Sequence, residues 1–227
     1  MNLQRTSYRC EAVSIPGFVQ QLAVGYVARG YVYYVSCIIP NGKNPSAVDA
    51  KLIARYNIAL SKTRRARRKA LGFANVQYLR YERFFLLLST EGHHLLQERE
   101  GQVMRDCRHI PILFSGYSIS SHNGSAHVEI EQQEYLALQS YFEERAGCCS
   151  ASQLEHEIHR LPFACYGPVI KQLYGLVSAV NEKRKTAGLD LLSSSCVRLK
   201  RRIYRPFDRS VRDEKWSEKV PVIRRTA

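Results

Sequence analysis

The chain has 227 residues, of which 45% are hydrophobic, and its lysines and arginines outnumber its aspartates and glutamates by 34 to 20. This composition excludes general disorder, and the length suits one domain or one domain with a small appendage. The formal charge of +14 favours a polyanionic partner, and among such partners nucleic acid rather than a membrane surface.

The most apolar stretch, residues 18–39, is interrupted by glutamines, an arginine and two glycines. A transmembrane helix needs about 18 consecutive apolar residues, so we expect no membrane span. The opening residues lack the apolar segment of a secretory signal, and the seven cysteines are irregularly spaced without a CxxC pair. We therefore expect a cytoplasmic protein with free thiols.

The first part of the chain predicts an arm, a helix and a strand. Residues 1–15 are polar and charged, which is typical of an N-terminal arm. A helix is predicted next, because Phe18, Leu22 and Tyr26 recur at four-residue spacing and would share one face. Gly30 ends this helix. The run 31–39 is rich in β-branched and aromatic residues and almost continuously apolar, so we expect a central strand buried on both faces.

Two helices and a hairpin are predicted next. Ser46 is a suitable N-cap for an amphipathic helix over residues 46–60. The basic run that follows predicts a second helix over 64–72, where a glycine ends it. Residues 75–89 are aromatic and aliphatic and predict either one long strand or a hairpin that turns near 81–83, of which we favour the hairpin.

The second half of the chain continues with a predicted hairpin and several helices. Residues 110–119 and 127–131 flank a polar turn and predict two paired strands. A helix follows and stops at Gly147, where small residues indicate a boundary. Beyond it we expect two helices and a basic strand over 196–207.

These elements predict an α+β fold with a central antiparallel or mixed sheet, helices on one side and a small basic C-terminal helical unit. The sheet strands would be those near 31–39, 75–89, 110–119 and 127–131. The expected organisation is an arm (1–15), an α+β core domain (16–147), a helical C-terminal unit with a basic strand (148–207) and a flexible tail (208–227).

Two basic clusters are the strongest functional signal. In the first, the bases would cover more than half the circumference of a helix, and their mutual repulsion is costly without a partner. In the second, Val197, Leu199 and Ile203 would anchor a strand whose bases face solvent. The predicted phosphate contacts are Arg64, Arg65, Arg67, Arg68 and Lys69, with Arg198, Lys200, Arg201, Arg202 and Arg205. We expect both clusters to share one surface.

Aromatic and basic residues are interleaved in a short stretch that follows the first basic cluster. Tyr78 and Tyr81 could stack on bases while Arg80 and Arg83 pair with phosphates, an arrangement that suits single strands. The alternative interpretation is an ordinary exposed strand that carries these residues for their sheet propensity.

Acids and histidines gather in residues 91–109, and a hydrolytic metal site needs such donors to converge on one cation. The spacing matches no recognised motif, and adjacent histidines on a strand would point to opposite faces. The candidate catalytic residues are Glu91, His93, His94, Asp106 and His109. A Mg²⁺- or Mn²⁺-dependent nuclease or nicking enzyme is therefore the alternative function; otherwise we expect no metal and no cofactor.

Nucleic-acid binding, to DNA or RNA, is the function that the sequence favours. An assembly factor that binds an acidic protein is a third hypothesis. The chain contains no glycine-rich phosphate loop, no GxSxG and no HExxH, so nucleotide hydrolysis, α/β-hydrolase chemistry and zinc proteolysis lack their usual motifs.

Overall fold

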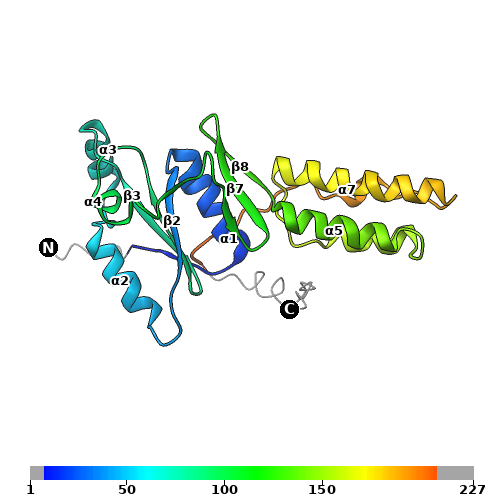
Figure 1. Ribbon diagram of the computed structural model, residues 1–227, viewed down its shortest axis with the longest axis horizontal. Helices are drawn as coiled ribbons and strands as arrows, with labels where there is room; N and C mark the ends of the chain where they lie inside the picture. The colour runs from blue at the N-terminus through cyan, green and yellow to red at the C-terminus, as the bar shows by residue number, and fades with distance from the viewer. Residues whose placement is uncertain (1–7, 209–227) are drawn as a thin grey trace. The chain divides into compact units, whose positions relative to one another are not determined.

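The computed structural model describes residues 8–208 and divides them into two compact units. Unit 1 comprises residues 8–112, 120–126 and 204–208, and unit 2 comprises residues 113–119 and 127–203. Both contain helices and strands, which confirms the α+β class (Figure 1). The expected boundary at 147 differs from this grouping, because the helix before it packs within unit 2.

Unit 1 is built on a five-stranded mixed sheet in the order β1-β3-β4-β2-β5. Its strands are β1 (Glu11–Ala12), β2 (Tyr33–Ile38), β3 (Val76–Tyr81), β4 (Phe84–Ser89) and β5 (Arg105–Asp106). β1 runs parallel to β3, and the other neighbours are antiparallel. The expected arm therefore contributes an edge strand.

The hairpin over 75–89 is confirmed, and it forms the middle of this sheet. Glu82, at the turn, has a φ of 51°, and Tyr81 pairs with Phe84 across it. The prediction that the strand near 31–39 is central and buried on both faces is wrong. β4 is central, with four consecutive apolar residues buried, whereas β2 becomes exposed towards its end, where Ile38 is 66% exposed.

The helices of unit 1 cover both faces of the sheet rather than one. The predicted helical face of Phe18, Leu22 and Tyr26 is buried, in α1 (Ile15–Gln20) and the π-helical turn that continues it to Tyr26. The Phe18 ring meets Tyr81 and Phe84 edge-on. On the opposite face, α2 (Pro45–Arg55) packs over Tyr78, since successive residues of a strand point to opposite sides.

The helices of unit 1 that follow β2 each begin with a side-chain cap. Asn44 caps α2 in place of the expected Ser46, because the helix begins at Pro45, two residues earlier than a Ser46 cap would place it. α3 (Lys62–Ala70) is capped by Ser61, and α4 (Leu95–Glu100) is capped by His94.

Unit 2 contains a three-stranded sheet and three helices. The sheet has the order β6 (Ile112–Phe114), β7 (Tyr117–His122) and β8 (Ser125–Ile130), with the hairpin tip 120–126 grouped with unit 1. The segments near 110–119 and 127–131 therefore form their own sheet and do not join the five-stranded one. Asn123 and Gly124 both have positive φ, which gives a tight turn and pairs β7 with β8.

The helices of unit 2 are α5 (Gln132–Arg145), α6 (Ala151–His159) and α7 (Gly167–Thr186), and α5 and α7 lie side by side (Figure 1). Arg184 of α7 is buried and donates to the carbonyls of Ala146 and Cys149, 2.7 and 2.8 Å away. The first bond satisfies the carbonyl at the C-cap of α5, and the second satisfies a carbonyl of the loop between α5 and α6. The predicted basic strand is absent: a 3₁₀ turn over Ser194–Cys196 is followed by irregular backbone to residue 205.

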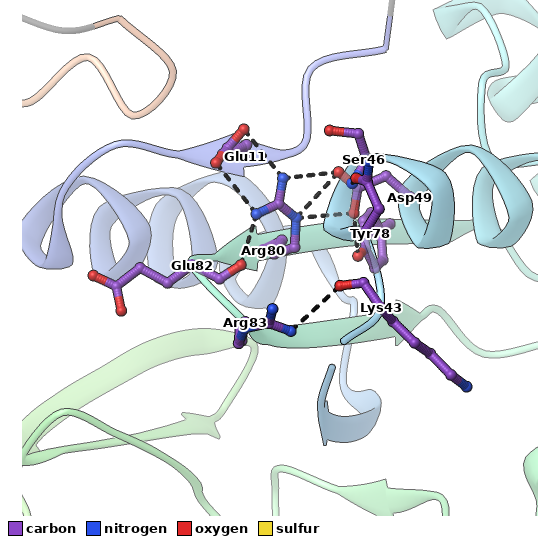
Figure 2. Close-up of polar contacts among 9 residues, drawn as sticks. Glu11, Lys43, Ser46, Asp49, Tyr78, Arg80, Glu82 and Arg83 are labelled. Atoms are coloured by element: carbon purple, nitrogen blue, oxygen red, sulfur yellow. Dashed lines mark hydrogen bonds and ion pairs between the residues drawn. The ribbon is translucent and has the colours of Figure 1, made fainter. Parts of the chain in front are cut away.

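A buried ion pair joins three segments of unit 1 (Figure 2). The Arg80 side chain is 3% exposed, and its Nε and Nη2 donate to the carboxylate of Asp49 at 2.9 Å. Its Nη1 donates to the Glu82 carbonyl at 2.6 Å, and its Nη2 lies 3.1 Å from Glu11. The Tyr78 hydroxyl also donates to Asp49, at 2.6 Å. One guanidinium thus links β1, α2 and the β3–β4 turn.

Replacing Asp49 by alanine should strongly destabilise the protein, because it leaves the Arg80 charge buried without its main partner. We expect urea denaturation to give a loss of about 3–5 kcal/mol in the free energy of unfolding. The matched control is Glu11→Gln: this carboxylate is 59% exposed, and its loss should cost less than about 1 kcal/mol. Equal effects of the two variants would contradict the assigned role of Asp49.

Candidate nucleic-acid interface

The first basic cluster forms α3, a nine-residue helix with six bases. The Ser61 hydroxyl accepts from the Arg64 amide at 3.3 Å, and the remaining residues, except one threonine, are good helix formers. Gly72, with a φ of 77°, follows the end of the helix. Lys62 belongs to this helix although the predicted contacts began at Arg64; the capping serine before it was the signal that placed it there.

One side of α3 is attached to unit 1 by polar contacts. The Arg68 guanidinium donates to the Ala74 carbonyl at 3.0 Å and lies 5.5 Å from the centroid of the Phe73 ring. The side-chain amide of Asn75, which is 5% exposed, donates to the Arg65 carbonyl at 3.0 Å. Arg65 and Arg68 are accordingly half-buried. These contacts fix the orientation of the helix without burying any of its residues.

The other bases of α3 face solvent. Lys62, Arg64, Arg67 and Lys69 are exposed, and none of the six bases forms an ion pair with a carboxylate in the described part of the chain. The first turn of the helix contains no acid, so the bases there oppose the helix dipole. This local charge stabilises neither the helix nor the core, and it is available to an anionic partner.

The second basic cluster is irregular in structure. Arg198 is half-buried and donates to the carbonyls of Leu161 and Phe163. The Arg201 guanidinium lies 4.8 Å from the centroid of the Tyr166 ring. The exposed bases of this segment are Lys200, Arg201, Arg202 and Arg205.

Two of the three expected anchors of this segment are not buried. Val197 is 4% exposed, but Leu199 and Ile203 are 60% and 81% exposed, because the segment pairs with no strand in the described chain. Residues 198–202 belong to unit 2 and Arg205 to unit 1, while α3 belongs to unit 1.

Tyr78 and Arg80 are not surface residues, and their predicted contacts with bases and phosphates are wrong. Tyr78 is fully buried and Arg80 is 3% exposed, since both point to the face that α2 covers. Tyr81 is half-buried against Phe18. Arg83 is half-buried and donates to the backbone carbonyls of residues 39, 40 and 43. The interleaved pattern therefore builds the sheet, and no stacking platform is formed by these tyrosines.

The acids and histidines of 91–109 do not converge. Arg108 binds both candidate carboxylates, Glu91 at 2.8 Å and Asp106 at 2.7 Å, and also contacts the Tyr33 hydroxyl at 3.0 Å. His93 and His109 are exposed. Across residues 8–208, no group of three histidines, cysteines, aspartates or glutamates is arranged to hold a metal ion. In the sequence, the spacing of Asp106 and Arg108 was the one feature that could have indicated that Arg108 pairs with a candidate carboxylate.

His94 has a structural role at the start of α4. Its Nδ1 accepts from the Leu96 amide at 2.9 Å, and its ring contacts the buried ring of Tyr56. Burial, and then the positive charge of Arg68, lower the pKa of His94 below its ordinary value. The neutral ring is required for the cap, because a protonated Nδ1 cannot accept a hydrogen bond.

Comparison with protein-family models, with curated proteins and with solved structures found no match. Within residues 8–208, none of the helices combines the length and the apolar character that crossing a bilayer requires.

The lowered pKa of His94 predicts that stability falls on acidification. The unfolded chain binds a proton at His94 near pH 6.5, before the folded chain does, so the free energy of unfolding should decrease from pH 7 to pH 5. His94→Asn keeps a capping acceptor but does not titrate, and it should show a smaller decrease in chemical denaturation. His93→Asn is the matched control. A decrease as large in His94→Asn as in the unaltered protein would contradict the assignment.

Proposed function

We propose that the protein binds nucleic acid and that α3 is its main phosphate-binding surface. The observation that carries this proposal is the concentration of six bases in nine residues, with none buried and none paired with a described carboxylate. Packing does not account for these charges, because the helix contributes no residue to the core. A phosphate backbone would supply the missing counter-charges along the whole helix.

The bases of α3 fall into two groups: those on the attached side position the helix, and those that face solvent would bind phosphate. Arg68 is held by the Ala74 carbonyl and the Phe73 ring, so it mainly positions the helix. Arg65 lies on the same side, where its carbonyl accepts from Asn75. The remaining four bases would each neutralise a phosphate and release its counterions. They are Lys62, Arg64, Arg67 and Lys69. Four such contacts correspond to a slope of about −3.6 in a plot of log affinity against log salt concentration.

The irregular segment of unit 2 supports the proposal as a second basic surface. Arg198 fixes its start through two carbonyls, and the exposed bases follow directly. A chain segment without regular structure can adjust its side chains to a backbone of phosphates. We assign it a supplementary role, since its bases are fewer and less constrained than those of α3.

The test is a variant of α3 in which the four exposed bases are replaced by glutamine: Lys62, Arg64, Arg67 and Lys69. Arg65 and Arg68 are kept because they lie on the attached side of the helix. We expect affinity for mixed-sequence nucleic acid to fall and the salt slope to become shallower by about 3–4, as roughly one unit is lost per phosphate contact. Fluorescence anisotropy at several salt concentrations measures both.

The control variant removes the same charge from other exposed positions of unit 1. Arg29, Lys43, Lys51 and Arg99 are all exposed and form no ion pair with a described carboxylate. Their replacement by glutamine should leave the slope close to that of the unaltered protein. If the two variants lose affinity equally, net charge rather than α3 governs binding, and the proposed surface is wrong.

A further inference from the structure

The seven exposed residues of α3 are arranged in three parallel rows. Successive residues of a helix are separated by about 100°, so Thr63, Ala66 and Ala70 fall within a sector of about 60°. All three are exposed, and they form a ridge of small side chains on the outward face.

Bases border this ridge on both sides. Lys62 and Lys69 lie along one side, and Arg64 and Arg67 lie along the other. Arg65 and Arg68 occupy the opposite, attached face, which agrees with their partial burial and with the bonds to Ala74 and Asn75. The ridge is therefore the part of α3 that points most directly away from unit 1.

We propose that α3 enters the major groove of double-stranded DNA with this ridge towards the base pairs; this inference rests on the proposed function. A helix with its side chains is about 10–12 Å across, and the major groove of B-form DNA is about 12 Å wide. A helix in the groove faces one sugar-phosphate backbone on each side. The two basic rows match this arrangement.

The small side chains of the ridge favour close approach to the bases. Alanine and the threonine methyl group can contact the methyl group of thymine. The ridge contains no arginine, asparagine or glutamine, the residues that form bidentate bonds with guanine or adenine, so sequence discrimination should be weak. The contact would consist mainly of phosphate pairs with apolar contacts between them.

Other nucleic acids fit α3 less well. The major groove of A-form RNA is deep and too narrow for side chains to read, so two basic rows around a helix would reach only its edge. Single strands are commonly held by aromatic stacking, but Tyr78 is buried and Tyr81 packs on Phe18. Phe73 is 46% exposed but lies under Arg68.

The test enlarges the ridge without changing its charge. Ala66→Leu together with Ala70→Leu adds bulk at two exposed helical positions and costs little helix propensity. The matched control, Ala47→Leu with Ala50→Leu, makes the same change at exposed positions of α2 in the same unit. Circular dichroism and thermal unfolding of both variants confirm that they fold.

Affinities are measured for duplex DNA, duplex RNA and single-stranded DNA of one sequence, and for phosphatidylserine vesicles. We expect the unaltered protein to favour duplex DNA by about tenfold or more, and the ridge variant alone to lose that preference while it keeps its affinity for single strands. Dimethyl sulfate footprinting should show protection at guanine N7, which lies in the major groove.

Two kinds of negative result have different meanings. Equal affinity for all three nucleic acids, with the ridge and control variants indistinguishable, would overturn the groove assignment while the effect of the four glutamine replacements still supports nucleic-acid binding. Binding to vesicles but to none of the nucleic acids would overturn both, and would assign α3 and the neighbouring exposed Leu71 and Phe73 to an anionic membrane surface.

Discussion

The ion pair between Arg80 and Asp49 is the constraint on which the rest of unit 1 depends. A guanidinium that is 3% exposed is stable only with its charge and its donors satisfied, and here the partners come from β1, α2 and the β3–β4 turn. These segments must therefore be in place together. Once they are, Tyr78 and its apolar neighbours are enclosed between α2 and the sheet, and Tyr81 is left for the opposite face, under α1.

The same principle explains why α3 differs from the other basic segments. Inside unit 1, Asp49 compensates Arg80, and at the surface Arg108 is compensated by Glu91 and Asp106. In α3 no described acid pairs with the bases. The helix is attached through the Arg68 side chain and through the Arg65 carbonyl, which accepts from Asn75. Its positive field is therefore an unbalanced local charge, which an anion stabilises and which salt screens.

Sequence patterns predicted the elements better than their placement. The four-residue spacing of Phe18, Leu22 and Tyr26 identified a buried helical face, and the aromatic and aliphatic run over 75–89 identified the hairpin, because both signals depend on residues close in the chain. The centre of the sheet was misassigned, since the apolar run near 31–39 resembles a central strand although β4 occupies that place. The basic strand over 196–207 failed for a similar reason: a strand needs a partner, which a local pattern does not reveal.

The amino-acid sequence by itself determined the α+β class, the positions of most helices and the concentration of bases in the segment that forms α3. Only the tertiary structure decided which charged and aromatic residues remain at the surface. Arg80 and Arg67 are the same type of residue and lie close together in the chain. Arg80 is nevertheless buried against a carboxylate 31 residues away, whereas Arg67 is exposed. The physical reason is that helix and strand periodicity act over a few residues, whereas burial and charge compensation depend on segments that meet only when the chain folds.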